Sequence, residues 1–80
     1  MQKWEYIFLI AGRANETWKI IMLNGREIRD WKNGPSMYDY INQKGDEGWE
    51  LVSTTYAPVF TQNAYVDSED YRLVMKRLKA

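Results

Sequence analysis

The stretch Lys44-Gly45-Asp46-Glu47-Gly48-Trp49-Glu50-Leu51-Val52 decides the fold, because a helical pattern ends in it on glycine and an extended pattern begins on tryptophan. Glycine lacks a Cβ, so Gly45 and Gly48 allow the sharp turn with positive φ that commonly follows a helix. The residues after Gly48 alternate and are rich in strand-forming types, which predicts a strand over residues 49–56.

The pattern before this turn predicts one helix of about three turns. Proline cannot continue a helix and serine can cap one, so Pro35-Ser36 marks its start, with Asp39 completing a weak capping box. An apolar stripe then follows at the spacing of one helix face; its members are Met37, Tyr40, Ile41 and the aliphatic stem of Lys44.

Strand patterns precede and follow this helix. Residues 3–10 and 18–23 carry β-branched and aromatic side chains, and Asn24-Gly25 favours a tight turn after which residues 26–29 fold back briefly. Residues 57–68 form a looser stretch broken by a proline, and residues 70–78 form the last strand. The order strand, strand, helix, strand, strand predicts a single α+β domain over residues 1–80, with one helix packed on one face of a small antiparallel sheet.

Both faces of the first two strands are apolar. In the first strand, alternation places Trp4, Tyr6, Phe8 and Ile10 on one face. In the second strand, it places Trp18, Ile20 and Met22 on one face, with Ile21 and Leu23 on the opposite face. One helix covers one face, so the other face needs cover from a second copy of the chain or from residues 57–68 folded over it. The small core favours the first, a symmetric dimer or higher even oligomer, and the second is the alternative.

The composition argues against several classes of function. The chain of 80 residues has 11 Lys+Arg and 11 Asp+Glu, so it lacks the excess positive charge that favours broad nucleic-acid binding or attraction to an anionic membrane. It has no cysteine and no histidine, which argues against disulfides, ordinary zinc sites, thiol nucleophiles and a histidine base. No apolar run approaches the ~20 residues of a membrane span. We therefore expect a cytoplasmic, non-enzymatic protein with no metal ion and no cofactor.

Three motifs carry a resemblance to a known family. They are Trp4-Glu5-Tyr6 near the start, Gly45-Asp46-Glu47-Gly48-Trp49-Glu50-Leu51-Val52 after the helix, and Tyr71-Arg72-Leu73-Val74-Met75-Lys76-Arg77 at the end. Through them the whole chain resembles, in outline, the small bacterial and phage proteins grouped as domain of unknown function 4177. The resemblance implies no agreed activity and no catalytic residues. The chain departs from shorter members at residues 17–31 and 57–68, where a function particular to it would lie.

Aromatic and arginine side chains in or near these two segments are the candidates for a binding site. Flat rings beside guanidinium groups can stack a planar anion, and the same residue types anchor protein interfaces. The candidates are Arg29, Trp31, Tyr56, Phe60, Tyr65 and Arg72. The leading interpretation is a homo-oligomeric protein that sequesters a small planar, nucleotide-like ligand at a subunit junction. The alternatives are an adaptor, such as a phage or bacterial regulator that blocks a host protein, and a small structural subunit.

Overall fold

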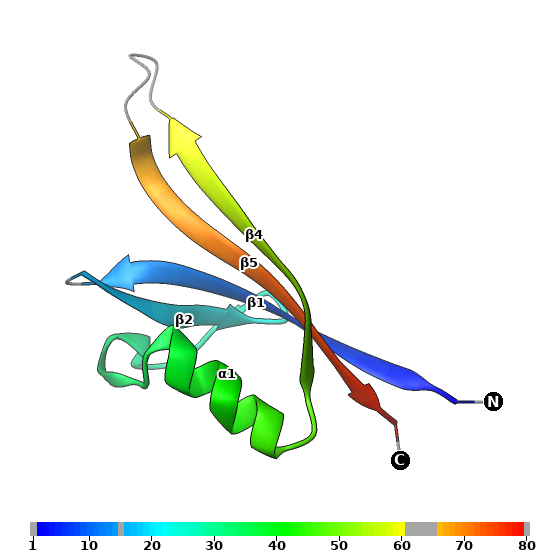
Figure 1. Ribbon diagram of the computed structural model, residues 1–80. Helices are drawn as coiled ribbons and strands as arrows, with labels where there is room; N and C mark the ends of the chain where they lie inside the picture. Colours follow the sequence, from blue (N-terminus) through cyan, green and yellow to red (C-terminus); the bar gives the residue numbers. More distant parts are fainter. Residues whose placement is uncertain (1, 15, 61–65, 80) are drawn as a thin grey trace.

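The computed structural model describes residues 2–14, 16–60 and 66–79 (Figure 1). Its elements are β1 (Trp4–Ala14), β2 (Thr17–Leu23), β3 (Arg26–Glu27), the 3-10 helix η1 (Trp31–Asn33), α1 (Met37–Asp46), β4 (Glu50–Phe60) and β5 (Val66–Leu78). All strand pairs are antiparallel, so the predicted α+β architecture with one α-helix is confirmed. The predicted order differs in its middle, where β3 and η1 stand between β2 and α1.

The turn at Asn24 and Gly25 explains the additional strand. These residues have φ angles of 51° and 83°, the left-handed pair that a tight hairpin turn requires. The chain therefore reverses at once, and Arg26 pairs with Leu23. Asp30, which is also left-handed with φ of 57°, then directs the chain into η1.

The first and last strands lie together at the centre of a five-stranded sheet with the order β3-β2-β1-β5-β4. They pair from Trp4 opposite Leu78 to Gly12 opposite Asp70 without a register shift. β4 pairs with the outer side of β5 and forms one edge of the described sheet. The two ends of the sequence therefore build the middle of the fold.

Helix α1 begins at the predicted Ser36 cap, but it runs through Gly45 to Asp46, so of the two glycines expected at positive φ only Gly48 adopts it. The Ser36 hydroxyl accepts a hydrogen bond from the Asp39 N–H at 3.2 Å, which satisfies one free donor of the first turn. At the other end Gly48 has φ of 95°, a conformation that side chains with a Cβ rarely adopt. The Trp49 N–H donates to the Lys44 carbonyl at 3.0 Å, so the chain passes from the helix almost directly into β4.

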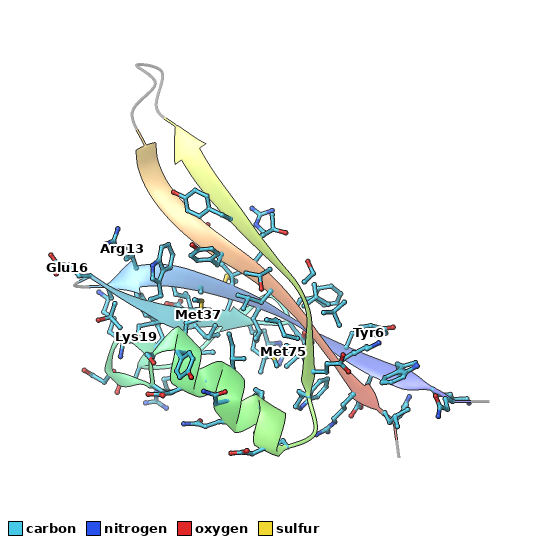
Figure 2. The ribbon with its side chains drawn as sticks, viewed as in Figure 1. Tyr6, Arg13, Glu16, Lys19, Met37 and Met75 are labelled. Atoms are coloured by element: carbon cyan, nitrogen blue, oxygen red, sulfur yellow. The ribbon has the colours of Figure 1, made fainter. Side chains whose placement is uncertain are left out.

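The core lies between the sheet and α1. Leu9, Leu73 and Met75 are each 1% exposed, and they come from the two central strands. Met37 and other apolar residues of α1 pack against this cluster, as Figure 2 illustrates for Met37 beside the sheet. The helix therefore covers one side of β1 and β5.

A register shift between β1 and β2 changes which residues face the core. Ile10 lies opposite Met22, but the next residue, Ala11, lies opposite Ile20. The prediction that Trp18, Ile20 and Met22 share a face is therefore wrong. Trp18 and Ile20 pack with the core, whereas Met22 lies beside Ile10 on the other side of the sheet. A bulge of one residue reverses the alternation beyond it.

The side of the sheet opposite α1 carries exposed apolar residues, and we call it the open face. Trp4, Tyr6, Phe8 and Leu78 are 39%, 51%, 58% and 52% exposed there. The pairing places Tyr6 and Met75 on opposite sides of the sheet (Figure 2). Among the described residues no helix lies over the open face, and this agrees with the expectation that one helix covers only one side.

Residues 57–68 do not form the predicted loose stretch where the structure describes them. β4 continues through Pro58 to Phe60 and β5 begins at Val66, so the two strands pair in a long hairpin that extends beyond β1 and β2 (Figure 1). Proline is tolerated there because β4 is an edge strand. The alternative in which this segment covers the open face does not hold for residues 57–60 and 66–68, which belong to the sheet; residues 61–65 lie outside the described residues.

The two glycines of the helix-to-strand turn give a matched test of this geometry. Gly48→Ala should lower the free energy of unfolding by about 1–2 kcal/mol, because alanine is strained at positive φ. Gly45→Ala should raise it by about 0.5–1 kcal/mol, because Gly45 is helical and a Cβ there meets nothing within 4 Å. Urea unfolding of both variants checks this. Equal effects at the two positions would contradict the assigned turn.

Candidate functional site

A small pocket opens between β2, η1 and the start of α1. Its volume is about 210 Å³, and its lining residues are Ile20, Ile28, Arg29, Asp30, Trp31, Gly34, Pro35 and Tyr40. The walls are mainly apolar and aromatic, with one guanidinium and one carboxylate among them. We call this the Trp31 pocket.

Local hydrogen bonds hold the pocket wall in place. The left-handed Asp30 accepts from the Asn33 side-chain amide at 2.8 Å, and the Gly34 N–H donates to the Trp31 carbonyl at 3.1 Å. Lys19 of β2 donates to the Gly34 carbonyl at 2.5 Å and so ties this turn to the sheet. The segment between β3 and α1 is therefore a fixed wall of the pocket.

The Trp31 ring has a defined orientation. Its indole N–H donates to the Glu27 carboxylate at 3.2 Å, and the Lys32 ammonium lies 5.6 Å from the ring centre. A ring held in this way offers a stacking surface without the entropy cost of ordering it on binding.

Arg29 and Tyr40 supply polar groups at this pocket. Arg29 is exposed, and its guanidinium has no hydrogen bond or ion pair to the part of the chain that the structure describes. Burial raises the pKa of the Tyr40 phenol above its ordinary 10.0, and the Glu47 carboxylate adds to the rise. Near neutral pH the pocket therefore has a free cation and a protonated hydroxyl.

The structure separates the residues that the sequence marked as candidates. Arg29 and Trp31 line one pocket. Tyr56 lies on β4 with its ring centre 5.4 Å from that of Tyr71, and Arg72 is exposed on the open face. Phe60 ends β4, and Tyr65 lies outside the described residues. Of the described candidates, two share a pocket and the others lie elsewhere on the sheet.

The sequence pattern indicated other roles for some residues that line the Trp31 pocket. Tyr40 belongs to the apolar stripe of the helix, and Pro35 marks the helix start, yet both also line the Trp31 pocket. The spacing of the apolar residues in the helix predicts that Tyr40 faces the sheet. It does not reveal that a neighbouring segment leaves space beside the ring, so no sequence signal identified these residues.

A second hollow, of about 360 Å³, lies at the far end of the sheet. It is lined by Trp4, Glu47, Gly48, Glu50, Lys76, Arg77 and Leu78. Its cations are already engaged: the Lys76 ammonium lies 4.3 Å from the Trp4 ring centre, and Arg77 lies 4.3 Å from that of Trp49 while donating to the Glu5 carboxylate and the Glu47 carbonyl. Arg77 thus braces the helix-to-strand turn, and the hollow is a poor anion site.

Two general features of the described residues bear on function. They include no group of three or more acidic side chains placed to hold a metal ion. None of their helices combines the length and the apolar character needed to cross a membrane.

The described residues form a small α+β protein with a sheet covered on one side, an open aromatic face and an aromatic pocket beside β2. The chain belongs to the family described as Domain of unknown function (DUF4177), whose family model matches residues 4–78. This confirms the resemblance in the sequence motifs. No curated protein and no solved structure matches the chain.

Tyr40 should ionise later than an exposed tyrosine. Its folded-state pKa is raised above the unfolded value, so the associated stability is fully present below pH 10 and falls as the pH rises through the folded-state pKa. Ultraviolet titration of phenolate absorbance checks this, with Tyr40→Phe lacking the late transition. Tyr38→Phe is the control, because the Tyr38 ring is 75% exposed. Coincident curves for the two variants would contradict the assignment.

Proposed function

We propose that this chain is a non-enzymatic binding protein that works as a symmetric homo-oligomer and sequesters a small planar anionic ligand. The main observation in support of this proposal is the open face, where the large apolar side chains of Trp4, Tyr6, Phe8 and Leu78 are exposed on one side of the sheet. The lack of histidine and cysteine supports a binding role over a catalytic one.

The open face has the composition of an interface. Aromatic residues are enriched at the centre of protein interfaces, and burying one such side chain contributes about 1.5–3 kcal/mol. Three aromatic residues, Trp4, Tyr6 and Phe8, follow one another on the same face of β1. A two-fold axis would bring the same patch of two copies together. Self-association therefore covers the side of the sheet that α1 does not reach.

The Trp31 pocket supports the ligand part of the proposal. Its volume of about 210 Å³ is below the range of about 300–1,000 Å³ for drug-sized ligands, so it fits one ring system and not a whole nucleotide. A nucleobase-like ring could stack on Trp31 and donate to the Asp30 carboxylate, while its anionic group remains outside and meets Arg29. The pocket lies on the α1 side of the sheet. A ligand bound there would lie within one subunit, and not at the subunit junction that the sequence suggested.

The second candidate function is a protein-interaction adaptor that blocks a partner protein, as in phage or bacterial regulation. It is favoured by the same open face, because tryptophan and tyrosine also anchor contacts between different proteins. The resemblance to bacterial and phage proteins supports such an origin, and a cysteine-free chain suits a reducing cytoplasm. A monomeric protein with an unchanged open face would favour this candidate.

The assembly part is tested at Phe8, which is 58% exposed on the open face. Phe8→Lys should lower the mass measured by light scattering by a factor of about two or more, because it places a charge within the apolar interface. Tyr38→Lys is the matched control, since Tyr38 is 75% exposed on α1. A parent protein that stays at 9.6 kDa at high concentration would reject self-association.

The ligand part is tested by calorimetric titration with mononucleotides and signalling dinucleotides. Trp31→Ala should weaken binding by about 1–3 kcal/mol through loss of stacking, and Arg29→Gln should weaken binding through loss of the contact with the phosphate. Arg72→Gln is the control, because Arg72 lies on the other side of the sheet. No heat and no thermal shift with any compound would reject the ligand and favour the adaptor.

A further inference from the structure

The two edges of the described sheet differ in how they are protected. At one edge, β3 is only two residues long and both are charged, Arg26 and Glu27. The following segment also runs along β2: the Ile28 N–H donates to the Ile21 carbonyl at 2.7 Å, and Lys19 forms a bridge with Ser36. Short, charged and covered strands are the usual means of preventing edge-to-edge pairing.

The β4 edge lacks most of this protection. β4 spans eleven residues, Glu50–Phe60, and hydrogen-bonds within the described sheet to β5 alone. Its first residue, Glu50, is its only charged one, and residues 50–56 are all exposed. Figure 1 shows no other element along its outer side. An exposed edge strand with so few charges is a template for pairing with another strand.

Two irregularities limit the part of β4 that can accept a partner. The register with β5 shifts between Leu51 and Ser53, and Pro58 has no N–H to donate. Between them, Ser53 to Ala57 pair with β5 without interruption. We call residues 53–57 the β4 window. Its central residue is Thr55.

We infer that the β4 window is a second self-association site, in which two copies pair antiparallel about a two-fold axis at Thr55. In this register Thr55 faces Thr55 of the other copy, Thr54 faces Tyr56, and Ser53 faces Ala57. None of these residues is charged, so the pairing meets no like-charge repulsion, and threonine pairs and aromatic–threonine pairs are favourable across strands. The sequence candidate Tyr56 becomes a partner-contact residue.

This inference goes beyond the proposed function, since it uses the backbone edge of β4 and does not need the open face, although the Thr55 side chain, opposite Arg72, lies on the same side of the sheet. Two distinct two-fold interfaces on one chain, an edge and a face, generate a closed tetramer of four copies where their axes intersect at right angles. Edge pairing alone gives a dimer with one continuous sheet of ten strands, twice the five of a single copy.

The absence of cysteine from the chain allows a direct test by disulfide cross-linking. Opposed residues of antiparallel strands have Cα atoms about 4.5–5.5 Å apart, within the range of about 4.4–6.8 Å that a disulfide bridges. Thr55→Cys should therefore form a covalent dimer on mild oxidation at least about tenfold faster than Gln43→Cys, an exposed control on α1. Equal rates for the two variants would overturn the inference.

A charge exchange at the same position gives an independent measurement. Thr55→Lys and Thr55→Glu should each weaken edge pairing, because identical charges then face each other, and an equimolar mixture should restore the parent mass. Failure of the mixture to restore it would overturn the inference.

Combining these variants with Phe8→Lys separates the two proposals. If Thr55→Cys still cross-links in the Phe8→Lys background, the edge pairs independently of the open face. If Phe8→Lys leaves the mass unchanged while Thr55→Cys cross-links, the open-face proposal fails and the edge stands. If Phe8→Lys alone yields a 9.6 kDa monomer, the edge inference fails.

Discussion

The antiparallel pairing of β1 with β5 is the contact on which the rest of the structure depends. It joins the two ends of the sequence across nine consecutive residue pairs, from Trp4–Leu78 to Gly12–Asp70. The three side chains with the least exposure among the large ones, Leu9, Leu73 and Met75, all come from this pair of strands. The hairpin partners β2 and β4 then add to its two sides, and α1 packs on one face. Because this contact closes a loop of nearly the whole chain, the fold depends on long-range pairing more than on local preference.

The cover supplied by α1 decides how the two faces differ. Ile7 and Leu9 of β1 are buried on the α1 side, whereas Trp4, Tyr6 and Phe8 are exposed on the other side. Their side chains are of similar apolar character, so the difference arises from the position of the helix and not from composition. The described part of the chain contains no further α-helix that could cover the open face. In the proposed assembly a second copy of the chain buries it.

Local signals in the sequence predicted the structure correctly where a residue type strongly favours one backbone conformation or one capping role. The Ser36 cap, the positive φ of Gly48 and the Asn24-Gly25 turn follow directly from capping and left-handed geometry. The failures lie where a strand is irregular. Periodicity does not reveal the bulge that reverses β2, and Pro58 indicated a break although an edge strand accommodates it. Both depend on which neighbour a strand has, and that is fixed only by the complete sheet.

Only part of the candidate site followed from the sequence, for the same physical reason. Arg29 and Trp31 share a pocket because they are near neighbours in one short segment, whereas Tyr56 and Arg72 belong to strands that place them on opposite sides of the sheet. The strand order also separates the pocket from the β4 edge, because the pocket lies beside β2, near the β3 edge, and β4 forms the opposite edge. If copies assemble through the open face and the β4 window, neither contact uses the α1 side of β2. The Trp31 pocket would then remain accessible in every subunit, so that assembly would multiply binding sites without building or blocking them.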